Sequence, residues 1–213
     1  MRITKAIFSS CLLAATALAQ SPRGFTPRTR HHLGVQYGDI ELHLGEELPQ
    51  SVPDASTPTV FSYRHLPGTY MILLTDLSIP FMFFPDNETS TLAPGLGKNR
   101  TTRLHWWQTD VTHDAWTSGF CYPNASALAP YAGPQPPSGD GFHQYVFWLF
   151  RQPDRFQAPP ASLVSDWQDP GSDARFNFSV PALVAQVGEP ISANFMRVEN
   201  AGNPGAPTAP SGR

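Results

Sequence analysis

The sequence predicts a single β-rich domain of the α+β class, because its apolar residues fall in short runs and only one segment carries complete helix signals. The runs are rich in β-branched and aromatic residues, and clusters of Gly, Pro, Asn, Asp and Ser separate them, as turns separate strands. The chain has no internal repeat and no heptad pattern. We expect strands at 35–44, 59–63, 70–75, 104–111, 145–150 and 191–198.

One helix is predicted at 180–187. Ser179 can cap its first turn, Pro181 suits a position where the backbone donor is not needed, and Gly188 can end it. A second helix candidate begins near Ser162.

The first 19 residues have the pattern of a secretory signal peptide. Arg2 and Lys5 give a basic start, a short apolar centre follows, and small residues up to Ala19 form a cleavage site. No later apolar run approaches the roughly 20 residues that a membrane-spanning helix needs. We therefore expect a secreted protein of the secretory pathway with no membrane span.

The mature chain is expected to be acidic. Its formal charge falls from −3 to −5 when Arg2 and Lys5 leave with residues 1–19, and 194 of the 213 residues remain, enough for one domain. The sequence shows no clustered basic surface of the kind that neutralises phosphates, so a nucleic-acid partner is not expected.

Composition predicts the domain boundaries. Residues 20–33 are polar, basic and proline-containing, and 201–213 are mostly Gly, Pro, Ala and Ser, so we expect a flexible leader and a disordered tail around a domain at 34–200. Within the domain, 81–103 is predicted to be an insertion loop. Cys121 is left without an intramolecular partner once Cys11 is removed, and we expect it to be buried as a small apolar residue.

Four sequons predict N-glycosylation, because the signal peptide would bring the chain to the enzymes that modify them. Two of them fall in the insertion loop and are favoured for that reason. The predicted acceptors are Asn87, Asn99, Asn124 and Asn177.

The most informative segment is a rigid polar loop that leads into a strand at 145–150. Pro134, Pro136 and Pro137 fix φ and remove amide donors in this loop, and its glycines permit close approach. His143 and Tyr145 are two residues apart and so project from one face of the strand. An imidazole and a phenol beside a preformed loop predict a binding site for a small polar ligand.

Three segments of the chain contain recognisable motifs. They are Asp-Leu-Ser-Ile-Pro at 76–80, Leu-His-Trp at 104–106, and Gly-Pro-Gln-Pro-Pro-Ser-Gly-Asp-Gly-Phe-His-Gln-Tyr at 133–145. Together they resemble the phosphatidylethanolamine-binding protein family, over about 34–200, whose motifs are Asp-Pro-Asp-x-Pro at a strand end, a strand containing Leu-His-Trp, and the loop Gly-x-x-Pro-Pro-x-Gly-x-His-Arg-Tyr. It is similar to diverged, secreted members from filamentous fungi.

The resemblance implies a large antiparallel sheet beside a smaller sheet, with a few peripheral helices and a small anion pocket at one end. It also implies that imidazoles and loop amides donate to the anion while a carboxylate orients an imidazole. No metal or other cofactor is expected; an open three-ligand centre from Asp76, His105 and His143 ranks lower. The remaining histidines are interpreted as surface or structural. The ligand-binding residues carried over by position are Asp76, Pro80, His105, Gly133, Pro136, His143 and Tyr145.

The chain departs from the family pattern at the rim of this pocket. Leu77 and Ser78 replace a proline and a carboxylate, Gln144 stands where arginine is common, and Gln135 replaces a glycine. These changes favour a small anion other than phosphatidylethanolamine itself.

Two functions remain open at this point, and with them the question whether the protein is an enzyme. The first is a secreted protein that binds a phospholipid head group or carboxylate, with inhibition of a protease as an additional role. The second, implied by fungal members found with clusters for dimeric polyketide anhydrides, is an accessory or catalytic role beside a cyclase, in which an imidazole moves a proton and loop amides stabilise an enolate-like charge. A serine hydrolase is not expected, because no Gly-x-Ser-x-Gly elbow occurs.

Overall fold

The computed structural model describes residues 19–54, 56–80, 100–123 and 127–201. The predicted signal peptide, insertion loop and tail fall almost entirely outside these ranges, as do Asn87, Asn99 and Asn124. None of the helices in the described part of the chain is long and apolar enough to cross a membrane.

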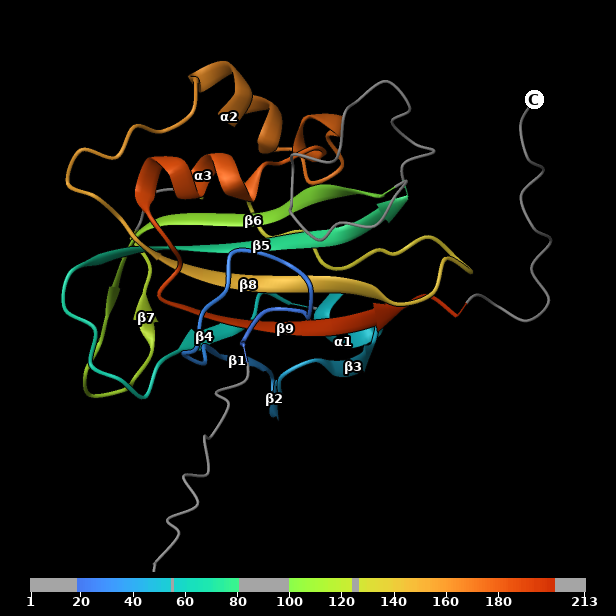
Figure 1. Ribbon diagram of the computed structural model, residues 1–213, viewed down its shortest axis with the longest axis horizontal. Coiled ribbons are helices and arrows are strands. Elements are labelled where there is room, and N and C mark those ends of the chain that lie inside the picture. The colour runs from blue at the N-terminus through green and yellow to red at the C-terminus, as the bar shows by residue number, and fades with distance from the viewer. Residues whose placement is uncertain (1–18, 55, 81–99, 124–126, 202–213) are drawn as a thin grey trace, which may run out of the picture.

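Two sheets of unequal size form the domain (Figure 1). All neighbouring strands are antiparallel except β3 and β9, which run parallel. The small sheet has the order β2 (Ile40–Glu41), β1 (Gly34–Tyr37), β4 (Thr59–Phe61). The large sheet has the order β3 (Glu46–Pro49), β9 (Ser192–Glu199), β8 (His143–Arg151), β5 (Thr69–Pro80), β6 (Arg100–His113), β7 (Phe120–Cys121).

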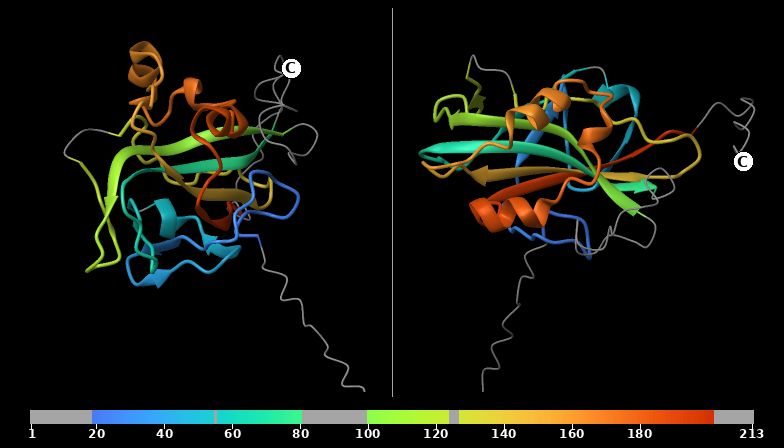
Figure 2. Two further views of the ribbon diagram at one scale, coloured as in Figure 1. Left: turned by 60° about the vertical axis from the view of Figure 1, so that its left-hand side comes forward. Right: turned by 90° about the horizontal axis from the view of Figure 1, so that it is seen from above.

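Helices and the small sheet cover opposite faces of the large sheet (Figure 2). On one face lie α2 (Ala161–Trp167), the short 3₁₀ helix η3 (Asp173–Arg175) and α3 (Val180–Val187), while α1 (Ser51–Asp54) lies with the small sheet. The β-rich class with a large and a small sheet is therefore confirmed.

Helix α3 has the ends that the sequence predicts. The Ser179 hydroxyl accepts from the Ala182 amide, and Gly188 ends the helix with a φ of 90°. Helix α2 begins one residue before the predicted position.

The central strands β5 and β8 are buried on both faces, which explains why each contains a continuous apolar run, 70–74 and 145–150, rather than an alternating pattern. Phe147 and Leu149 of β8 pack in the core layer under the small sheet. Val146, Trp148 and Phe150 pack in the second layer under the helices. The predicted aromatic run therefore supplies both layers of the core.

Several boundaries differ from those predicted. The expected strand at 35–44 is two short strands, because Gly38 turns the chain with a φ of 56°. The end of the predicted insertion, 100–103, belongs to β6. Cys121 is exposed on β7, so the expectation that it is buried is wrong.

The segment 20–33 is packed against the domain, where its composition predicts a flexible leader. Leu33 donates its amide to the Ala193 carbonyl, and the Ala193 amide donates to the His31 carbonyl. Phe25 and Leu33 are buried in the core, so two apolar residues and a short ladder with β9 hold a segment whose composition is otherwise polar.

Leu33→Ala should lower the free energy of unfolding by about 2–5 kcal/mol, because Leu33 is completely buried and its truncation leaves a cavity. Ile40→Ala is the control, since Ile40 is 41% exposed and should cost far less. Urea unfolding measures both. Equal, small effects for the two variants would mean that the leader is mobile after all.

Candidate ligand site

The candidate site lies on the adjacent antiparallel strands β5 and β8, at the position where Asp76 pairs with Tyr145. Asp76 is completely buried, and three groups satisfy its carboxylate. One oxygen accepts from the Ser78 amide at 2.7 Å, the other contacts His143 Nδ1 at 2.7 Å, and the Tyr145 hydroxyl also bonds to it. These partners are needed because burying a charge costs free energy unless the charge is paired and hydrogen-bonded.

His143 lies between two carboxylates. Its Nδ1 contacts Asp76 and its Nε2 contacts Asp140 at 2.8 Å, so both ring nitrogens carry hydrogen and the imidazole is charged. Burial lowers the pKa of His143, but the hydrogen bonds and charges of the two carboxylates outweigh it and raise the pKa above its usual value.

Asp140 is held in place by the loop and by a second cation. Gly139 and Gly141 on either side of it have φ values of 77° and 83°, which fix the turn that points Asp140 at the imidazole. The Arg100 guanidinium also bonds to Asp140 and donates to the Ser78 carbonyl at 2.7 Å. Charges therefore alternate along the chain of contacts from Asp76 to Arg100.

His105 sits at a β-bulge in β6. Thr75 pairs with Leu104 and Leu74 pairs with Trp106, so His105 is an extra residue in the strand. The bulge lets two consecutive residues, His105 and Trp106, face the core layer that contains Tyr145. The His105 ring lies edge-on to Tyr145, with ring centres 5.1 Å apart.

The neutral form of His105 is fixed by its surroundings. Its Nδ1 contacts the Ala132 carbonyl at 2.9 Å, and because a carbonyl only accepts, Nδ1 must carry the hydrogen. Burial, together with the charge of Arg103, lowers the pKa of His105 to about 4. Its Nε2 is therefore an unprotonated acceptor, and it is buried without a hydrogen-bond partner among the described residues. The expectation that this imidazole donates to an anion does not fit that geometry.

Arg103 is a site residue that the sequence motifs did not indicate. Its charge interacts with Asp76 and Tyr145, and its guanidinium lies 4.9 Å from the centre of the Phe176 ring. One terminal nitrogen donates to the Pro170 carbonyl at 2.7 Å, while Nε is buried without a partner. Its position opposite Asp76 depends on the register of β5 and β6, which no sequence motif reveals.

The other predicted residues contact the scaffold. A Cβ on Gly133 would lie 2.6 Å from Asp54 Cα, so glycine permits α1 to pack against this loop. The Pro136 carbonyl accepts from Asn200, and Pro80 pairs with Arg100 at the end of β5. The structure thus brings together Asp76, His105, His143 and Tyr145, and gives Gly133, Pro136 and Pro80 supporting positions.

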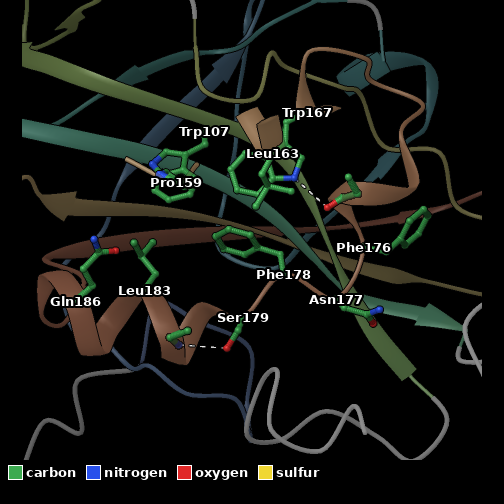
Figure 3. A pocket seen from close by; sticks show the side chains of 12 residues that line it. Trp107, Pro159, Leu163, Trp167, Phe176, Asn177, Phe178, Ser179, Leu183 and Gln186 are labelled. Atoms are coloured by element: carbon green, nitrogen blue, oxygen red, sulfur yellow. Dashed lines mark hydrogen bonds between the residues drawn. The ribbon is translucent and has the colours of Figure 1, made fainter. Parts of the chain in front are cut away.

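Two cavities in the described part of the chain lie elsewhere. One, of about 380 Å³, is apolar and lies between β6, α2 and α3 (Figure 3). Trp107, Trp167 and Phe178 line it, on the face of the sheet opposite Asp76 and His105. Asn177 also lines it, with its side-chain oxygen accepting from Thr101. Within the described ranges, no group of three or more His, Cys, Asp or Glu is placed to hold a metal ion.

The pKa values of the two site histidines should be shifted in opposite directions, downward for His105 and upward for His143. Long-range ¹H–¹⁵N spectra should show His105 as the Nδ1–H tautomer down to about pH 4, because protonation would place an unpaired charge in the interior. His143 should remain doubly protonated above pH 6.5, because both ring nitrogens face carboxylates. His105→Asn and His143→Gln assign the two signals. Titration of both rings near pH 6.5 would contradict the charges described here.

Comparison with known proteins identifies the family of this chain. Residues 41–199 match the sequence profile of the phosphatidylethanolamine-binding protein family. The chain is 28% identical over 205 residues to "Phomoidride biosynthesis cluster protein N" of Talaromyces stipitatus, covering 89% of this chain and 94% of that protein. It is 30% identical over 161 residues to the "26 kDa secreted antigen" of Toxocara canis, covering 75% of this chain and 52% of the antigen.

A solved structure supports the fold alone. The carboxypeptidase Y inhibitor, solved in complex with its cognate proteinase, superposes with a TM-score of 0.55 at 18% identity and covers 81% of this chain and 85% of the inhibitor. The profile match extends over more than half of the chain and includes all the strands from β3 to β9. The chain is therefore a diverged, fungal-type member of the phosphatidylethanolamine-binding protein family.

Proposed function

We propose that this protein is a secreted binding protein whose site, formed by Asp76, Arg103, His105, His143 and Tyr145, holds a small ligand carrying both an anionic oxygen and an acidic hydrogen. A hydrogen phosphate ester, such as a phospholipid head group, or a monoprotonated dicarboxylate has this chemistry. The observation that carries the proposal is the buried Nε2 of His105, an acceptor without a partner.

Most polar groups in the site already form hydrogen bonds within the protein. Both nitrogens of His143 bond to carboxylates, and the Tyr145 hydroxyl bonds to Asp76. Among the described residues, two buried polar atoms of the site have no hydrogen-bond partner, the acceptor Nε2 of His105 and the donor Nε of Arg103. A ligand O–H donating to the first and a ligand O⁻ accepting from the second would satisfy both.

Secretion rests on the signal-peptide pattern of residues 1–19, and a relative described as a secreted antigen is compatible with it. A protease partner has less support, because the inhibitor that shares this fold is only 18% identical. We therefore place small-ligand binding first and a protein partner second.

A second candidate is a role in fungal secondary-metabolite biosynthesis, assisting the dimerisation or cyclisation of polyketide anhydride monomers beside a cyclase. The relative named for a phomoidride biosynthesis cluster favours it, because the similarity covers nearly the whole of both chains. In that role His105 Nε2 would accept a proton and Arg103 would stabilise the oxyanion left behind. A pKa of about 4 makes His105 a weak base, so the geometry favours binding over proton abstraction.

Isothermal titration with O-phosphorylethanolamine and with maleate tests the binding proposal. His105→Asn keeps a donor for the Ala132 carbonyl but removes the acceptor at the Nε2 position, and Arg103→Gln removes the cation. Each variant should bind about tenfold or more weakly, since hydrogen bonds to charged groups contribute roughly 1.5–3 kcal/mol. Arg155→Gln, at an exposed position away from the site, should bind like the parent.

The pH dependence sharpens this test. His105 remains neutral from about pH 4 upward, so affinity for O-phosphorylethanolamine should fall as the phosphate loses its second proton above about pH 6. Affinity that rises over the same range would show that the dianion is preferred and that the acceptor is not used.

The biosynthetic candidate has its own readout. The purified protein is incubated with maleic-anhydride-type monomers, alone and with a cyclase, and coupled product is measured by mass spectrometry. Product that depends on His105 would favour the second candidate. Tight binding of O-phosphorylethanolamine without any coupling would exclude it.

A further inference from the structure

A second cavity, of about 570 Å³, concentrates positive charge at the other end of the large sheet. It is an open surface hollow, because all of its basic lining residues are exposed. We name it the arginine cavity. No carboxylate is among its lining residues, and its basic lining residues are Arg28, Arg30, His31, Arg64, His65 and Arg151.

The charge of this cavity contrasts with the rest of the molecule. The whole chain carries 14 Lys and Arg against 17 Asp and Glu, yet four of these basic residues line one cavity. The ion pairs formed within the described ranges involve Arg100, His143 and Arg197 with carboxylates, and none of the four cavity arginines. Like charges gathered without counter-charges repel each other, and a bound anion removes that repulsion.

The fold fixes the backbone from which these side chains extend. Segment 20–33 brings Arg28, Arg30 and His31, and Thr29 anchors it by donating its hydroxyl to the Ile191 carbonyl at 3.2 Å. The Arg28 Nε donates to the Phe25 carbonyl within the same segment. The basic stretch that composition assigns to a mobile leader is thus held against the domain.

The opposite wall is equally anchored. Arg64 follows β4, and its amide donates to the Ser62 hydroxyl at 3.2 Å. Arg151 ends β8, and its guanidinium donates to the Pro67 carbonyl at 3.3 Å, leaving further donors unused. Tyr70, whose hydroxyl donates to the same carbonyl, is buried in the wall between them.

We propose that the arginine cavity is a second ligand site and that it binds a small molecule carrying two or more anionic groups, of the tricarboxylate or diphosphate type. Planar guanidinium groups bind carboxylate and phosphate oxygens in pairs, and four of them around one cavity match a ligand with several such groups better than a single carboxylate.

This site is separate from the one described above. Tyr70 and Arg151 pair at one end of β5 and β8, and Asp76 and Tyr145 pair six residues further along. At about 3.3 Å per residue, the two sites are roughly 20 Å apart. The two proposals can therefore fail independently.

Isothermal titration at low ionic strength with citrate, pyrophosphate and acetate tests the proposal. Citrate or pyrophosphate should bind with a 1:1 stoichiometry, and acetate at least about tenfold more weakly. The Arg64→Gln/Arg151→Gln double variant should lose at least about tenfold in affinity, because two charged donors are removed. Arg30→Gln provides an independent variant on the opposite wall and should also weaken binding.

The controls distinguish binding in the arginine cavity from a general effect of the protein's charge. Arg23→Gln/Arg155→Gln removes the same amount of charge at exposed positions outside the cavity and should leave affinity unchanged. Arg103→Gln should weaken O-phosphorylethanolamine binding and leave citrate binding intact. No heat with citrate and pyrophosphate, or equal losses in the cavity and control variants, would overturn the proposal. So would binding to phosphatidylserine vesicles in a sedimentation assay without binding to either free anion.

Discussion

The contact between Asp76 and His143 is the interaction on which the site depends. Both side chains are completely buried, and taking two ions out of water costs several kcal/mol each. Close pairing and additional hydrogen bonds must therefore offset this desolvation cost. The fold supplies both through a chain of partners, because Ser78 and Tyr145 satisfy Asp76 while Asp140 satisfies the far side of His143. The chain joins β5, β8 and the loop before β8, which fixes their relative positions.

This arrangement also determines which atoms are available to a ligand. Because Asp76 and Asp140 occupy both nitrogens of His143, the imidazole that the family motif marks most clearly is structural and charged. The second imidazole, His105, is neutral and keeps one buried acceptor unused. Under the proposed function, a ligand would supply a hydrogen as well as a negative charge, which would distinguish this site from a simple anion pocket.

The apolar runs were sufficient to predict the central strands β5 and β8, and the family motifs indicated Asp76, His105, His143 and Tyr145. The short strands β3 and β7 were not predicted. The bulge at His105 could not be predicted either, since a bulge depends on the pairing of two strands. The role of Arg103 and the docking of segment 20–33 were missed for the same reason. Both follow from long-range pairing, whereas composition describes only local preference.

The charged side chains at the two ends of the large sheet therefore differ in whether they are paired. At one end Asp76 and Asp140 are matched by cations and donors, and at the other four arginines have no carboxylate partner within the described residues. The same strands, β5 and β8, connect the two ends. The acidic balance of the whole chain did not indicate this separation, because it arises only when the segment at 20–33 folds back onto the sheet.

A double-mutant cycle on Asp76→Asn and His143→Gln tests the central interaction most directly. Each single variant should lower the free energy of unfolding by about 3–5 kcal/mol, because it removes one charge from a completely buried pair. His143→Gln leaves the Asp76 carboxylate without this cation, and Asp76→Asn leaves Asp140 as the one carboxylate in contact with His143. The double variant should cost little more than either single one, since no unpaired charge remains from this pair. Two small losses that simply add would contradict the account, because they would show that the two side chains do not depend on one another.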